Sequence, residues 1–201
     1  MRLLIFISAF TLLSCGQKAS DKKPVNNDTA TNTVAKKDSI VKMQQEFNNT
    51  PDETAVNQSL GKKLDNKWHV MNDHEAGWLK DAFDYFIVPK RKENPGYPYI
   101  TKGDFNGDGK TDTAAVVTDN NKKDFRIAIL AGSGNIEFWE EDVLINAALT
   151  TVPKGMIEGG DIDHPKKIKM KGDGINVEYF EKASFIIYWT GSSYKRIQTG
   201  D

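Results

Sequence analysis

The chain has 201 residues, a formal net charge of −1 and a single cysteine, Cys15. A near-neutral chain offers no basic surface to displace counterions from phosphates, so we expect no nucleic-acid partner. One cysteine excludes both an intrachain disulfide framework and a cysteine-rich zinc site.

The N-terminus combines a positive start with a short apolar run. Met1 and Arg2 precede residues 3–13, which are apolar except for Ser8 and Thr11. This run is too short for a resident transmembrane helix, which needs about 20 residues. Its length is typical of the hydrophobic region of a signal peptide.

A cysteine stands directly after this run, in the sequence Leu12-Leu13-Ser14-Cys15. The tetrapeptide resembles the lipobox of bacterial lipoproteins, whose cysteine is lipidated and becomes the first residue of the mature chain. The resemblance implies a cleaved signal peptide over residues 1–14 and attachment to a membrane of the bacterial envelope through lipid on Cys15. The next residue is Gly16 rather than an aspartate, which is similar to sorting signals for the outer membrane.

Composition divides the rest of the chain into a tether and a domain. Residues 17–38 are polar and almost free of bulky apolar side chains, which predicts a flexible tether. Thr50-Pro51-Asp52-Glu53 offers an N-cap, a proline at N1 and a capping-box glutamate for a short helix. We assign residues 15–66 to the lipidated cysteine and a flexible tether with possible short helices. Residues 67–201 are predicted to form a single globular β-rich domain.

The domain is expected to begin with a helix. Asn72 is a candidate N-cap, Trp78, Leu79, Ala82, Phe83 and Phe86 would form one apolar face, and Pro89 would end the helix. Beyond Pro89, runs rich in β-branched and aromatic residues predict strands at 97–101, 113–118, 125–131, 136–139, 175–180, 184–190 and 194–197. Residues 141–165 predict no element. Short turns and the absence of helical crossovers favour an antiparallel meander, which makes the fold class α+β.

One loop carries a strong chemical pattern. Oxygen-bearing side chains fall at its positions 1, 3, 5 and 9, and a backbone carbonyl is available at position 7; these residues are Asp104, Asn106, Asp108, Asp112 and Lys110. Gly109 at position 6 permits a sharp turn. Ca²⁺ takes six to eight oxygen ligands, and this alternation directs them inward. The spacing predicts one structural Ca²⁺, although turn propensity alone is an alternative reason for Asn, Asp and Gly here.

This loop is not an EF-hand, because position 12 is Ala115 rather than glutamate and a strand follows. The pattern D-x-N-x-D-G-x-x-D before a strand resembles the calcium loop of FG-GAP or integrin-like (VCBS-type) propeller repeats. That family repeats its motif around a propeller, whereas here the motif occurs once and is only echoed by Lys171–Gly174. The resemblance therefore implies a blade-like sheet and not a full propeller, which needs at least four blades.

Other constellations are weaker. His69 and His74 lack the spacing of an H-E-x-x-H zinc site. Asp161, Asp163 and His164 could supply metal or acid–base groups, or simply form a solvated loop. Aromatic residues alternate along the last strands, and those on the outer face could form a binding surface.

The leading hypothesis is a lipid-anchored, non-enzymatic envelope protein with one structural Ca²⁺ and a protein or glycan partner. Its place would be the outer membrane, facing the periplasm or the surface. Two alternatives remain. The first is a periplasmic inhibitor or immunity-type lipoprotein, and the second is a hydrolase that uses the loop from Asp161 to His164.

Overall fold

The computed structural model describes residues 50–139, 141, 143, 145–161, 164–180 and 182–200. The predicted signal peptide, Cys15 and the part of the predicted tether up to residue 49 lie outside the described residues. So do Glu140, Asp142, Asp163 and the side chain of Asp161.

The first described element is the helix α2 (Pro51–Leu64). It begins as the sequence predicts, because the backbone N–H of Glu53 donates to Thr50 Oγ1 at 3.2 Å and Pro51 occupies N1. Val56 and Leu60 are buried in the main core. A helix assigned by sequence to the segment before residue 67 thus contributes directly to the packed domain.

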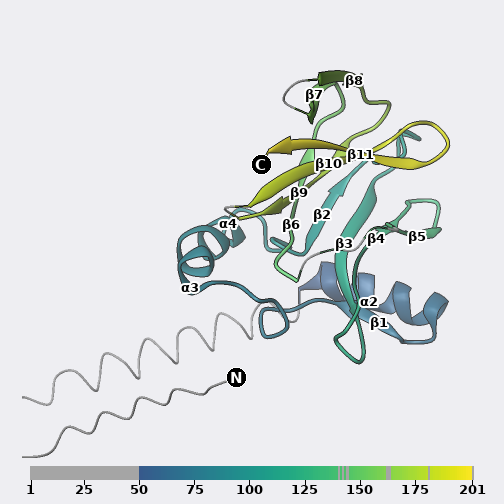
Figure 1. Ribbon diagram of the computed structural model, residues 1–201. Coiled ribbons are helices and arrows are strands. Elements are labelled where there is room, and N and C mark those ends of the chain that lie inside the picture. The colour runs from purple at the N-terminus through teal and green to yellow at the C-terminus, as the bar shows by residue number, and fades with distance from the viewer. Residues whose placement is uncertain are drawn as a thin grey trace, which may run out of the picture. The chain divides into compact units, whose positions relative to one another are not determined.

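The first sheet is antiparallel and contains five strands: β1 (Trp68–Val70), β2 (Ile100–Gly103), β3 (Asp112–Asp119), β4 (Phe125–Leu130) and β5 (Ile136–Phe138). β3 pairs with β4, and β4 pairs with β5. Both β1 and β2 also pair with β3. β1 pairs with the last three residues of β3, and β2 pairs with its first four. Figure 1 shows α2 beside β1 at the lower end of this sheet.

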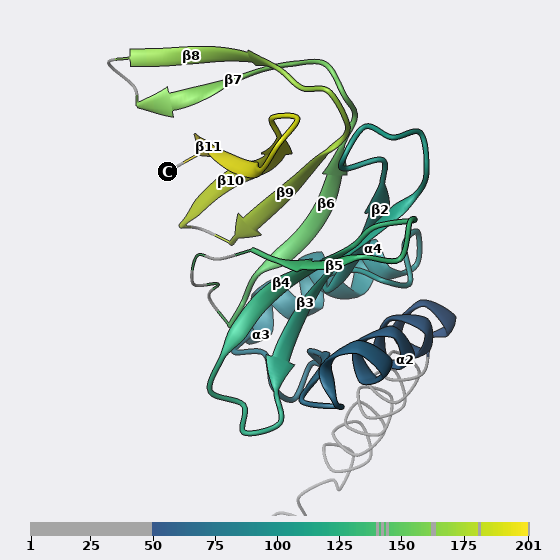
Figure 2. The same cartoon turned by 90° about the vertical axis from the view of Figure 1, so that its right-hand side faces the viewer.

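The second sheet has the order β11-β10-β9-β6 and is also antiparallel. Its strands are β6 (Ala148–Val152), β9 (Gly174–Tyr179), β10 (Ala183–Trp189) and β11 (Tyr194–Gly200). β6 lies beside β2 of the first sheet, as Figures 1 and 2 both show. The hydroxyls of Thr101 and Thr151 are 2.7 Å apart, and Leu149 N–H donates to Pro98 O at 2.7 Å. These contacts join the two sheets.

A two-stranded hairpin forms the third sheet, from β7 (Met156–Asp161) and β8 (His164–Lys169). It lies against β11, and an ideal Cβ on Gly159 would come within 2.1 Å of Gln198 O. Glycine at 159 is therefore required by the close approach of two backbones. Buried Ile157, Met170, Ile186 and Ile197 form a small core beneath the hairpin.

The predicted helix after Asn72 is wrong in position and in its end. Asn72 instead caps a single turn, accepting from His74 N–H at 3.0 Å, and the helix runs later through α3 (Lys80–Ala82), the π-helical turn η1 (Phe83–Ile87) and α4 (Val88–Arg91). Pro89 does not end it: the preceding π turn, closed by Val88 N–H on Phe83 O, carries the chain past a residue without an N–H. Two residues of the predicted apolar face are exposed, Leu79 by 72% and Phe86 by 50%.

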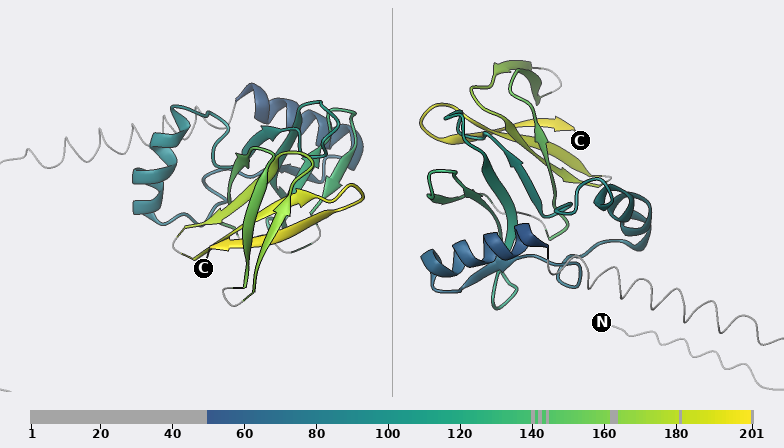
Figure 3. Two further views of the ribbon diagram at one scale, coloured as in Figure 1. Left: turned by 90° about the horizontal axis from the view of Figure 1, so that it is seen from above. Right: turned by 180° about the vertical axis from the view of Figure 1, so that it is seen from behind.

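The expectation of a mostly antiparallel β domain with a small helical part is confirmed. All seven predicted strands are present within a few residues of their expected bounds. The strands are divided among three sheets rather than one. β6 forms its strand pairing with β9, whereas it contacts β2 through the Thr101 and Thr151 side chains and bonds to Pro98 in the loop before β2. Figure 3 shows these layers from above and from behind, with α2 and the α3–α4 segment at different sides of the first sheet.

Candidate metal centre

The candidate calcium loop joins β2 to β3, and its two ends are held together by the pairing of Gly103 with Asp112. Two of its glycines, Gly107 and Gly109, have φ values of 74° and 83°. These left-handed conformations favour glycine and wind the chain tightly between two paired strands.

Asp112 closes the loop from inside. The side chain is fully buried, and its Oδ2 accepts from the backbone N–H groups of Phe105 at 2.9 Å and Asn106 at 3.2 Å. Its Oδ1 accepts from Gly132 N–H at 2.7 Å. Burial raises the pKa of the Asp112 carboxyl, and the three backbone donors act in the opposite direction. Asp112 therefore ties the loop to its own start and to the β4–β5 turn.

Asp104 occupies position 1 and has an unequal pair of carboxylate oxygens. Oδ2 accepts from Gly109 N–H at 3.0 Å, which draws position 6 back over position 1. Oδ1 is buried and has no hydrogen-bond donor among the described residues. A buried carboxylate oxygen without a partner is costly, since the charge has lost its water and gained nothing in return.

The remaining loop positions make local turns. Asn106 Oδ1 accepts from Asp108 N–H at 2.8 Å, and Asp108 Oδ1 accepts from Lys110 N–H at 2.8 Å. Each acceptor keeps further lone pairs for another partner. The donor set is thus composed of carboxylate, amide and carbonyl oxygens, which suits a hard cation such as Ca²⁺.

The sequence echo at Lys171–Gly174 is a neighbour of this loop rather than a second copy of it. Asp173 Oδ2 accepts from Asp104 N–H at 2.9 Å, and Asp173 N–H donates to Asp104 O at 2.7 Å. Asp173 Oδ1 accepts from Lys154 N–H at 2.9 Å. This aspartate therefore attaches the candidate loop to the second sheet.

The structure does not gather the carboxylates tightly. Among the described residues, no three side chains of the types His, Cys, Asp and Glu come close enough together to hold a metal ion. A Ca²⁺ site here would depend on Asn106 and the Lys110 carbonyl as well as on Asp104 and Asp108. Asp112 has its oxygens already engaged by three N–H groups.

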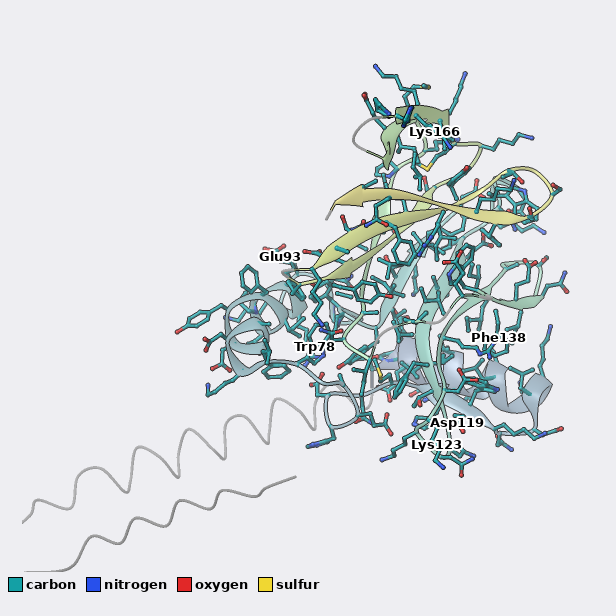
Figure 4. The ribbon with its side chains drawn as sticks, viewed as in Figure 1. Trp78, Glu93, Asp119, Lys123, Phe138 and Lys166 are labelled. Carbon is teal, nitrogen blue, oxygen red and sulfur yellow. The ribbon has the colours of Figure 1, made fainter. Side chains whose placement is uncertain are left out.

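A second polar centre, which sequence reasoning missed, lies beneath the α3–α4 segment. Arg91 holds the Asp73 carboxylate with both terminal nitrogens, of which Nη1 lies 2.7 Å from Oδ2. Tyr99 OH donates to Asp73 Oδ1 at 2.9 Å and accepts from Trp78 Nε1–H at 2.8 Å. Figure 4 labels Trp78 between this helical segment and the sheets. The side chain of Asp73 is only 2% exposed, so this network is a buried ion pair with its hydrogen bonds satisfied.

The histidines take ordinary structural roles. His69 lies on β1, and its Nε2 is 3.0 Å from Glu75 Oε1, while His74 is exposed. Glu53 of α2 faces this pair, and burial raises its pKa to about 6.

The alternative catalytic loop cannot be assembled from the described residues. His164 is exposed at the start of β8 and pairs through its backbone with Asp161. Asp163 and the side chain of Asp161 lie outside the described residues.

Comparison of the chain with protein-family models, with curated proteins and with solved structures found no match in any of the three. None of the helices within residues 50–200 that the structure describes has the length and apolar character needed to cross a membrane.

Proposed function

We propose that this protein is a lipid-anchored component of the bacterial envelope, a binding module whose domain is stabilised by one Ca²⁺ in the loop from Asp104 to Asp112. The lipobox-like sequence ending at Cys15 supports the anchor. The arrangement of the loop supports the ion. The same loop pattern underlies the resemblance to FG-GAP and integrin-like calcium repeats.

The observation that carries the calcium proposal is the unpartnered Asp104 Oδ1. The other oxygen of this carboxylate, Oδ2, already accepts from Gly109 N–H. No donor among the described residues compensates the buried Oδ1. A cation at that oxygen would remove the desolvation penalty. The ion would act on stability and would take no part in chemistry.

Calcium binding is expected to raise the melting temperature. Extracellular calcium modules bind with Kd of about 10⁻⁴–10⁻³ M, so 10 mM Ca²⁺ would add roughly 1.4–2.7 kcal/mol. For a domain of this size the melting temperature should rise by roughly 3–10 °C relative to EDTA, as measured by differential scanning calorimetry.

The double variant Asp104→Ala with Asp108→Ala should lose this rise. Asp81→Ala, an exposed carboxylate on α3, is the matched control and should keep it. An identical melt in Ca²⁺ and EDTA for the wild-type chain would show that the loop is a turn without an ion.

Lipid attachment has its own test. Metabolic labelling with a fatty acid should mark the wild-type chain but not Cys15→Ser, and only the wild-type chain should sediment with outer membranes. Two or three acyl chains give durable anchoring, whereas one chain is marginal. Labelling of Cys15→Ser would contradict the anchor.

A further inference from the structure

Two adjoining hollows lie between β5 and the start of β11. The larger has a volume of about 430 Å³ and is lined by residues 137–139 and 193–196, together with Glu141. The smaller, of about 210 Å³, continues from it toward the candidate calcium loop. Both are lined by Glu137 and Tyr194. We call them together the inter-sheet groove; Figure 1 shows β5 and the β10–β11 turn on the same side of the molecule.

Aromatic side chains from both sheets line this groove. Trp189 and Tyr194, at the two sides of the β10–β11 turn, are half-buried, with ring centroids 4.8 Å apart. Phe138 and Trp139 contribute from the first sheet, and Figure 4 labels Phe138 at β5. Aromatic faces provide a large apolar contact area at little cost in conformational entropy.

Polar groups stand beside these rings. Glu137 is exposed and borders both hollows, and Asn106 of the candidate calcium loop borders the smaller one. Lys195 lines the larger hollow and is exposed.

The charges that line the larger hollow balance. Glu137 and Glu141 are matched by Lys195 and Arg196, and Arg196 Nη1 lies 2.9 Å from Glu141 Oε2. The carboxylates of the candidate calcium loop act on Tyr194, which lines both hollows, so an anionic ligand is disfavoured and a neutral one fits the balanced lining.

A peptide strand is a poor fit to the same place. Two edge strands border the groove: β5 has only three residues, and β11 offers only residues 194–196 before β7 lies against it near Gln198. Addition of a peptide strand relies on a ladder of main-chain hydrogen bonds, which a three-residue edge cannot supply at length.

We propose that the inter-sheet groove binds a neutral oligosaccharide. A sugar ring presents an apolar C–H face and a rim of hydroxyls, which match the rings of Trp189 and Tyr194 and the acceptor Glu137. The exposed Lys195 provides a donor for a hydroxyl or acetamido oxygen. This inference rests on the proposed role as a binding module and names its ligand class.

The test is isothermal titration calorimetry of the full chain with three uncharged probes: cellotetraose, maltotetraose and the tetramer of N-acetylglucosamine. At least one probe should bind with one site per chain. Trp189→Ala and Glu137→Gln should each weaken this binding about tenfold, the cost of losing one good stacking or hydrogen-bonding contact. Glu137 is exposed, so its variant reports on binding even if Trp189→Ala unfolds.

Tyr85→Ala is the matched control, since Tyr85 is an aromatic residue 72% exposed on η1 and outside the groove. It should bind the probe like the wild-type chain. The proposal is overturned if no probe binds, or if both groove variants bind as tightly as the wild-type chain. Binding of unstructured peptides in place of the three probes overturns it as well.

The calcium and saccharide results are separable. A melting temperature that rises in Ca²⁺ without saccharide binding removes the groove proposal alone. Saccharide binding that depends on Glu137, without any calcium response, supports the groove and removes the ion.

Discussion

The two main sheets share one strand plan but use different connections. In the first sheet β2, β3, β4 and β5 pair in chain order, and in the second β6, β9, β10 and β11 do the same. Between β2 and β3 the first sheet has a tight loop of Asp, Asn and Gly residues. The second sheet has the β7–β8 hairpin in that place.

These two connections are held by different forces. The loop from Asp104 to Asp112 is held by carboxylates that accept backbone N–H groups, while the hairpin is held by the small apolar core of Ile157, Met170, Ile186 and Ile197. Hydrogen bonds to a buried carboxylate are directional, so the loss of that one side chain leaves several donors without an acceptor. Apolar burial is instead spread over several side chains. The comparison predicts that each connection has its own point of failure.

Removal of Asp112 should have the largest effect. Asp112→Ala leaves three buried or partly buried N–H groups without acceptors, at about 1–3 kcal/mol each. We expect a loss of about 3 kcal/mol or more in the free energy of unfolding, measured with urea in EDTA at pH 7. Asp108 is exposed in the same loop, so Asp108→Ala should change the free energy of unfolding by less than about 0.5 kcal/mol. Equal losses in the two variants would contradict the role given to Asp112.

Removal of apolar volume under the hairpin should come next. Ile197→Ala empties part of the small core and should cost about 2 kcal/mol. Hydrogen exchange should become faster in β7 and β8 while the loop around Asp112 stays protected. Thr199→Ala, exposed on the same strand, is the control. Faster exchange in both connections would mean that they are not independent.

The smallest expected effect is a pH dependence of the free energy of unfolding that comes from Glu53 of α2. Burial raises the pKa of Glu53 to about 6 against an ordinary value of 4.5, despite opposing contributions from Thr50 and His69. Between these two pKa values the folded state holds a proton on Glu53 that the unfolded chain releases. The contribution of the protonated Glu53 to the free energy of unfolding is therefore fully present below pH 4.5. It is lost as the pH rises through about 6.

Glu53→Gln should remove this loss, which amounts to about 1–2 kcal/mol. The measurement is the difference in unfolding free energy between the variant and the wild-type chain at pH 4.5 and pH 7. The variant should gain relative to the wild-type chain at pH 7. A difference that does not change with pH would contradict the buried, protonated Glu53.

The strands were predictable because most of them pair with a neighbour in the chain and bury regular apolar positions. β3 and β4 are rich in Ala, Val and Ile, and their turns contain Asn, Asp and Gly. β6 to β8 were missed for the opposite reason. β6 finds its partner β9 more than twenty residues away, and β8 has the sequence HPKKIK with one apolar side chain that packs.

The residue types of the candidate site were predictable from the sequence, but the different hydrogen-bonding roles of its aspartates were not. Spacing alone makes Asp104 and Asp112 equivalent ligands, whereas folding buries Asp112 against three N–H groups and leaves Asp104 Oδ1 unpartnered. Likewise, Asp73 resembles an acidic residue of a helix start. Only the tertiary fold brings it to Arg91, eighteen residues later, and to Tyr99.

Each sheet is made from one continuous stretch of chain, residues 68–138 for the first and 148–200 for the second. Their shared boundary is the main hydrophobic core, to which the first sheet contributes Val116 and the second contributes Leu149 and Val177 among others. The contacts of Thr101 with Thr151 and of Asp104 with Asp173 add hydrogen bonds to it. The covalent chain crosses this boundary once, between Phe138 and Ala148. A molecule arranged in this way is suited to fragment complementation: two separately expressed halves, divided in that crossing, carry complete sets of paired strands, and burial of the shared core would drive them to associate.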